Sequence, residues 1–161
     1  MIALLLLLAQ ENPEYRYWAD FKPGTWVEMK IESHQNGLRF EGDVKATLVS
    51  ISAERATVER RTRMKIGERV VEETSREEIR ARDDKAGKIL RESDAEIEVA
   101  GRRLPCKLYE LTQEKTKGVK MNVKWWASKE IPSGLARMEM IPEGAEKALI
   151  TIVATAWERS Q

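Results

Sequence analysis

Apolar and polar residues alternate with a period of two over most of the chain after Thr25, and this pattern constrains the fold more than any other feature. Successive side chains of a β-strand point to opposite faces, so alternation predicts strands with one buried and one wet face. The pattern is clearest in residues 118–141. Its apolar positions there are Val119, Met121, Val123 and Trp125, then Ala136, Met138 and Met140. The Pro-Ser-Gly break at 132–134 predicts a short loop between two paired strands.

Turn residues divide the rest of the chain into further strands. Asn36-Gly37 supplies the two positive-φ residues of a tight hairpin turn. Gly42 is interpreted as a bulge, and after it the apolar phase changes parity at Val49 and Ile51, as a bulge or twist would cause. The last strand is apolar on both parities, which predicts a central or doubly covered strand. The expected strands cover residues 27–32, 38–51, 56–66, 70–82, 89–99, 104–109, 119–126, 135–140 and 148–157.

One short helix precedes these strands. Asn12 can cap it, Pro13 suits its first position, and it should end near Lys22. Aromatic residues recur within it at helical spacing: Tyr15, Trp18 and Phe21. The chain is therefore predicted to be mainly β, an antiparallel meander that curls into a half-barrel or barrel with the helix over one mouth. A flat sandwich is the alternative.

Composition narrows the functional classes. A chain of 161 residues is most simply one β-rich domain, here 10–161. A charged fraction of 34% with a net charge of +1 argues against a nucleic-acid binder, which needs unopposed Lys and Arg. Cys106 is the single cysteine and His34 the single histidine, so we expect no disulfide, no Cys-based zinc site, no metal and no cofactor.

Residues 1–9 consist of Met1 and an apolar run from Ile2 to Ala9. This run is too short to cross a bilayer as a helix. Its length suits the apolar region of a signal peptide or a remnant of one, and this predicts a periplasmic or secreted protein. No Lys or Arg precedes the run, and Leu7 stands where a small residue is preferred. The other interpretation is a first strand or helix of the fold itself.

Several methionines fall on the predicted apolar faces, and methionine suits both irregular cores and adaptable apolar sites. A filled core is the simpler interpretation of such a pattern. An open barrel would instead give a cavity for a lipid, an acyl chain or another apolar small molecule. The candidate lining residues are Met29, Ile31, Met64, Met121, Trp125, Met138 and Met140.

The opposite face of the same stretch carries Lys120, Lys124 and Trp126. Cations beside an exposed indole could contact an envelope protein or an anionic head group. Lysines that protect an edge strand explain the same pattern more simply.

No catalytic motif is present. His34 lies beside the predicted turn and is expected to be exposed, without a nucleophile in reach. Cys106 lies between Leu104 and Leu108 on an apolar face, which predicts a buried and unreactive thiol. A pair of catalytic carboxylates among the many Asp and Glu residues cannot be recognised from spacing alone. We expect a protein that is not an enzyme.

The sequence layout is an export signal, a short helix and then a long antiparallel meander. This layout resembles the bacterial lipoprotein-localisation (LolA/LolB-like) half-barrel proteins, and the resemblance implies an apolar concave surface that shields lipid or acyl chains. The leading hypothesis is a non-catalytic, extracytoplasmic binding or carrier module for an apolar ligand, with no transmembrane segment. The alternative is an interaction or structural protein of the cell envelope that uses the Lys and Trp face and has a filled core.

Overall fold

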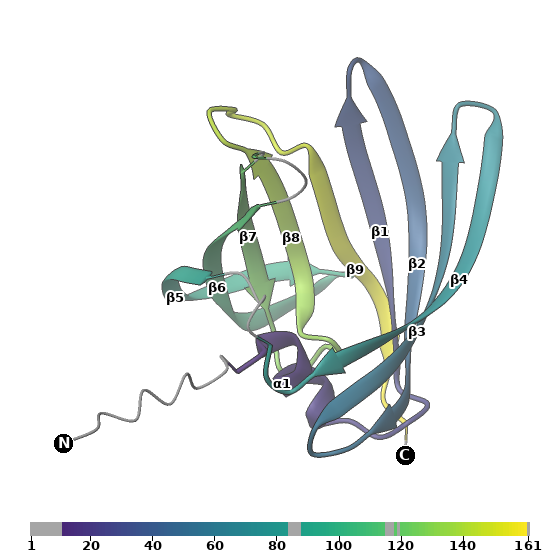
Figure 1. The fold of residues 1–161 in the computed structure, drawn as a ribbon, viewed down its shortest axis with the longest axis vertical. Helices are drawn as coiled ribbons and strands as arrows, with labels where there is room; N and C mark the ends of the chain where they lie inside the picture. Colours follow the sequence, from purple (N-terminus) through teal and green to yellow (C-terminus); the bar gives the residue numbers. More distant parts are fainter. Residues whose placement is uncertain (1–10, 84–87, 115–117, 119, 161) are drawn as a thin grey trace.

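The computed structural model describes residues 11–83, 88–114, 118 and 120–160. The predicted signal segment 1–9 therefore lies outside the described residues. In the described part, nine strands form one antiparallel sheet in the order β4-β3-β2-β1-β9-β8-β7-β6-β5, curved around α1 and not closed (Figure 1). The elements are α1 Pro13–Ala19, β1 Trp26–Gln35, β2 Leu38–Ile51, β3 Arg55–Ile66, β4 Arg69–Arg80, β5 Lys88–Val99, β6 Arg102–Glu114, β7 Lys120–Ala127, β8 Leu135–Pro142 and β9 Ile150–Glu158.

This architecture confirms the predicted mainly β fold with a curved antiparallel sheet and one short N-terminal helix. β4 and β5 are its two edges. Asn36 and Gly37 have φ values of 50° and 76°, as the predicted hairpin turn requires. The register of β2 on β3 shifts between Leu48 and Ser50, which accounts for the predicted change of apolar phase.

The prediction of a bulge at Gly42 is wrong. Gly42 stands opposite Ile31 and Met64 with no shift in register on either side. A Cβ atom at this position would lie 2.7 Å from the carbonyl oxygen of Arg63 and would overlap the Met64 sulfur. Glycine is needed here because β3 approaches β2 closely and the Met64 side chain covers the strand.

The distal half of the β5–β6 hairpin packs back against the sheet. Val99 and Leu104 join the main core, in which Ala136 of β8 and Ala154 of β9 are also buried. Trp126 and Val153 pack against the same core from the convex side of their strands. β9 lies between β1 and β8, so its two apolar parities have the central position that the sequence predicted.

Helix α1 lies at one end of the concave side (Figure 1). The Asn12 side chain accepts a hydrogen bond from the Glu14 amide at 3.1 Å, and Pro13 is the first helical residue, as expected. The helix ends at Ala19 and not near Lys22, because Asp20 leaves helical geometry and the Phe21 amide donates back to the Trp18 carbonyl at 3.0 Å.

The loop between β7 and β8 holds this helix in place. Gly134 has a φ of 72°, and a Cβ atom there would lie 2.5 Å from Cδ2 of Tyr17. Residues 131–134 of this loop are buried, with Ile131 fully inaccessible, and Ser128 is buried as well. β7 and β8 pair with each other, as the sequence predicted, but the loop that joins them is part of the core.

Candidate functional site

The concave side of the sheet encloses a cavity of about 670 Å³ beside α1. This volume lies within the range of about 300–1,000 Å³ that is usual for small-molecule sites. One part of its lining is apolar and comes from β1, β9, β8, β7, β6 and the edge strand β5. The residues of this apolar wall are Met29, Ile89, Leu111, Trp125, Leu135, Met138, Met140 and Ile152. The remaining lining is mainly polar, with Pro13 and Ile79 as its apolar members, and comes from the start of α1, β3, the end of β4, β6 and the β7–β8 loop. Its residues are Asn12, Pro13, Glu14, Arg60, Glu77, Glu78, Ile79, Arg80, Asp83, Gln113 and Ser133.

An aromatic cluster supports the apolar wall. The Trp125 ring meets the Tyr17 ring edge to face at 5.6 Å and the Tyr109 ring at 5.3 Å between centroids. The Tyr17 and Tyr109 hydroxyls are 3.4 Å apart, and burial together with this hydrogen bond raises the pKa of Tyr17. The buried indole nitrogen of Trp125 has no hydrogen-bond partner among the described residues. This part of the wall therefore offers an apolar and rigid surface.

A charged cluster lies on the polar side of the cavity. Arg60 donates from Nη2 to Oε1 of Glu14 and from Nε to Oε2 of Glu77, both at 2.8 Å. Burial raises the pKa of Glu14 most strongly, the Arg60 charge opposes this shift, and the Glu77 charge adds to it. The Glu14 side chain is 36% exposed and lines the cavity.

The register of β3 and β4 explains why these charges face inward. Buried Ala56 and Val58 point to the concave side, and Arg60 follows on the same parity. Glu77 stands opposite Val58, whereas Glu78 has the other parity and bonds to Arg55 at 3.1 Å. The two parities of this edge strand therefore hold separate ion pairs, and residues of both, Glu77 and Glu78, line the cavity.

Four of the seven predicted lining residues line the cavity: Met29, Trp125, Met138 and Met140. The other three are not part of its lining. Ile31 is half-buried against the main core, Met64 packs over Gly42, and Met121 is buried at 3% exposure. Because the predicted faces were assigned strand by strand, they could not show where along each strand the cavity ends.

Sequence reasoning missed Leu135 because the alternation placed it on the outer face. A register shift between Trp126 and Ala127 pairs Leu135 with Ala127, and this turns Leu135 toward the cavity. Sequence reasoning also missed the charged side of the cavity, since Arg60 and Glu77 lie in strands whose other charges face water. Only the proximity of α1 to β3 and β4 distinguishes these two residues.

The predicted partner face differs from expectation in one respect. Lys120 is exposed and Lys124 is half-buried. Trp126 is also half-buried and not exposed, because it packs against the main core with the Arg137 guanidinium 6.0 Å from its ring centroid. The indole is covered because the β5–β6 hairpin packs back over this side of the sheet, which alternation in β7 could not reveal.

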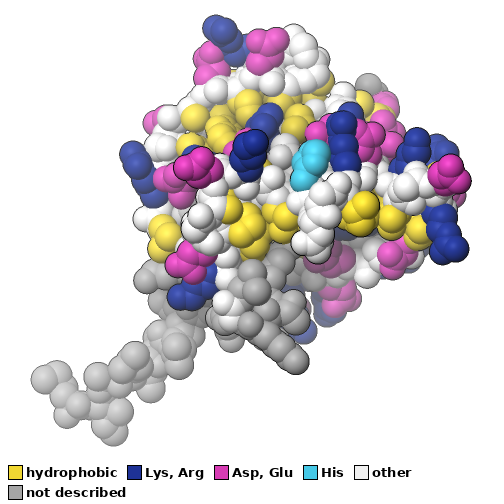
Figure 2. Space-filling model, turned by 90° about the horizontal axis from the view of Figure 1, so that it is seen from above, with side chains coloured by type: hydrophobic (Ala, Val, Ile, Leu, Met, Phe, Trp, Pro, Cys, Tyr) yellow, Lys and Arg dark blue, Asp and Glu magenta, His cyan; other side chains and the backbone are white. Residues whose placement is uncertain are grey.

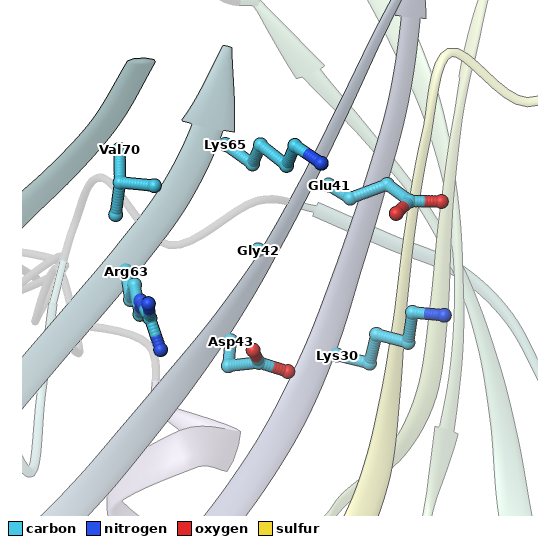
Figure 3. A pocket seen from close by; sticks show the side chains of 7 residues that line it. All are labelled: Lys30, Glu41, Gly42, Asp43, Arg63, Lys65 and Val70. Atoms are coloured by element: carbon cyan, nitrogen blue, oxygen red, sulfur yellow. The ribbon is translucent and has the colours of Figure 1, made fainter. Parts of the chain in front are cut away.

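A second hollow, of about 210 Å³, lies on the convex side of the long hairpins (Figure 3). Lys30, Asp43 and Arg63 stand side by side on neighbouring strands, and the next row holds Glu41, Lys65 and Val70. Alternating charges of this kind stabilise neighbouring strands by about 0.2–1 kcal/mol per pair. The hollow lacks an apolar wall, so cross-strand pairing explains it sufficiently.

Apolar side chains are also exposed at the tips of the two long hairpins. Leu38 is 62% exposed, and Val70 and Val71 are each 50% exposed. Viewed from this end, hydrophobic side chains lie between charged ones of both signs (Figure 2). His34, in β1 of the first of these hairpins, is exposed, as expected.

Cys106 is buried, and burial with the nearby Glu96 charge raises its thiol pKa, which agrees with the predicted unreactive thiol. Within the described ranges, no group of three His, Cys, Asp or Glu side chains is arranged to hold a metal ion. The same residues contain no helix with the length and apolarity to span a membrane.

Comparison with known proteins gives a likeness of fold. No protein-family model matches the chain, and no curated protein matches it. A solved structure from Bacteroides fragilis, described as a "putative exported protein with YmcC-like fold", aligns with a TM-score of 0.53 at 8% identity. The alignment covers 86% of this chain and 97% of that one. The curved antiparallel fold therefore also occurs in that protein, while the resemblance to the lipoprotein-localisation half-barrels stays a prediction.

Proposed function

We propose that this protein is a non-catalytic, extracytoplasmic binding or carrier module for an apolar ligand such as a lipid or an acyl chain. The observation that carries the proposal is the cavity of about 670 Å³, one wall of which is apolar. An apolar wall together with polar groups that fix the orientation of a ligand is typical of small-molecule sites. The description of the Bacteroides fragilis protein as exported supports the proposed location.

The lining favours binding over catalysis. Arg60 is bonded to both of its carboxylate neighbours, and no nucleophile paired with a base lies among the lining residues. On the apolar wall, Met138 of β8 pairs with Trp125 of β7, so a flexible thioether and a rigid indole form adjoining parts of the wall. This combination suits an apolar chain of variable shape.

Native mass spectrometry of protein purified without detergent tests the proposal. We expect either a co-purified lipid or saturable binding of N-phenyl-1-naphthylamine, an uncharged apolar fluorophore. The absence of both would contradict the proposed function.

Met138→Glu locates the binding site. A carboxylate on the apolar wall should weaken binding of the fluorophore by at least about tenfold, because its desolvation opposes ligand entry. Leu38→Glu makes the same chemical change at an exposed hairpin tip outside the cavity lining and should leave binding unchanged. Equal losses in the two variants would place the site elsewhere. Thermal unfolding of both variants checks that each remains folded.

A further inference from the structure

We infer that the ligand of this cavity is an amphiphile with a single positive charge, whose ammonium group binds at the cluster formed by Glu14, Arg60 and Glu77. This inference rests on the proposed function, because it assigns the polar end of the molecule whose chain the apolar wall would hold. The structure supplies both parts of such a site in one cavity.

The charges of the cluster do not balance. Two carboxylates share one guanidinium, so the three side chains together carry one negative charge when both carboxylates are ionised. Arg60 uses its Nε for Oε2 of Glu77, and Oε1 of Glu77 accepts no hydrogen bond from any residue that the structure describes. An ammonium group has three donors and no acceptor, which suits this oxygen and neutralises the cluster.

Glu78 and Arg80, the neighbouring charged residues of β4, have the other parity from Glu77. Glu78 is bonded by Arg55, and Arg80 stands opposite Arg55 on the same parity, away from Arg60. Within the cluster, two carboxylates therefore oppose the single guanidinium of Arg60. An anionic head group would be repelled by this arrangement.

The position of the cluster favours an amphiphile over a free amine. Glu14 and Glu77 come from α1 and β4, whereas Met138 and Trp125 come from the middle of the sheet, and all four line the same cavity. A molecule that touches both sides buries an apolar chain and keeps its charge beside the half-exposed carboxylates. A small amine without a chain would leave the apolar wall uncovered.

Competition between three ligands with the same chain tests the inference. Dodecylamine, dodecanol and dodecanoate are each titrated at neutral pH against bound N-phenyl-1-naphthylamine, below the concentrations at which they aggregate. We expect dodecylamine to displace the fluorophore at about tenfold lower concentration than dodecanoate, with dodecanol between them. Equal potency, or a preference for dodecanoate, would overturn the inference and leave the proposed function standing. Failure of the fluorophore to bind would overturn both.

Glu77→Gln identifies the group that selects the charge. The substitution keeps the shape of a side chain that is 53% exposed and removes the excess negative charge, so the advantage of dodecylamine over dodecanol should disappear. Glu96→Gln is the matched control, since Glu96 is 58% exposed and paired with Arg103 outside the cavity lining. It should retain the full preference. A preference that survives in Glu77→Gln would assign the selectivity to other groups and contradict the inference.

Discussion

The two sides of the cavity arise from the same alternation of residues but differ in character, as the inner strand β7 and the edge strand β4 illustrate. β7 lies between β6 and β8, and every second residue from Met121 to Ala127 is buried. β4 is an edge strand, and at inward-facing positions such as Ser75 and Glu77 it exposes polar side chains. Edge strands are commonly protected by charge. The contrast shows that one curved sheet can form a site with an apolar and a polar side from strand alternation alone, without a dedicated sequence motif.

Truncation of Trp125 should have the largest effect on stability, and it tests the contrast between the two sides of the cavity. Trp125→Ala removes a buried ring that contacts Tyr17 and Tyr109, so we expect the free energy of unfolding to fall by about 3–5 kcal/mol. Glu77→Ala on the polar side should lower it by no more than about 1 kcal/mol, since exposed ion pairs contribute little. Urea denaturation measures both changes. Similar losses would contradict the assignment of the core to the apolar side.

Alanine substitutions at two glycines test the packing of α1 against the apolar side. Gly134→Ala should destabilise the fold by about 2–4 kcal/mol, because the added methyl group would overlap the Tyr17 ring at a positive φ. Gly144→Ala has a comparable φ of 83° and no atom within 4 Å of the new Cβ, so it should lower stability by about 1–2 kcal/mol. Thermal or urea unfolding compares them. Equal effects would show that the ring contact is unimportant.

The smallest expected effect concerns the pH dependence of the stability that the polar side contributes. Because the pKa of Glu14 is raised in the folded protein above its ordinary value of 4.5, the folded state holds this proton more tightly than the unfolded state. The resulting contribution to stability is complete below pH 4.5 and is lost as the pH rises through the folded pKa. Glu14→Gln should therefore flatten the fall in unfolding free energy over this range. An unchanged profile in urea titrations would contradict the shift.

Local features of the fold could be predicted from the sequence because they depend on neighbouring residues. Asn36-Gly37 forms the expected hairpin turn, Asn12 caps the expected helix, and the phase change after Leu48 marks a real shift in register. The central position of β9 followed from its two apolar parities. In each case the signal lies within a few residues of the structure that it specifies.

Features that depend on distant segments could not be predicted. Gly42 looked like a bulge, but the reason for a glycine there is the approach of Met64 from the next strand. Trp126 looked exposed, but the β5–β6 hairpin packs back over its side of the sheet. Arg60 and Glu77 looked like ordinary surface charges until the position of α1 brought Glu14 beside them.

The most direct test of an apolar ligand site on the concave side is a proton–nitrogen correlation spectrum of the indole groups during titration with N-phenyl-1-naphthylamine. Trp125 lines the cavity, whereas Trp26 lies under Lys45 at 4.2 Å and is not part of the lining. We predict that the Trp125 indole resonance shifts in a saturable manner while that of Trp26 stays in place. A spectrum in which Trp125 is unchanged, or in which Trp26 or Trp126 shifts instead, would contradict the proposed site.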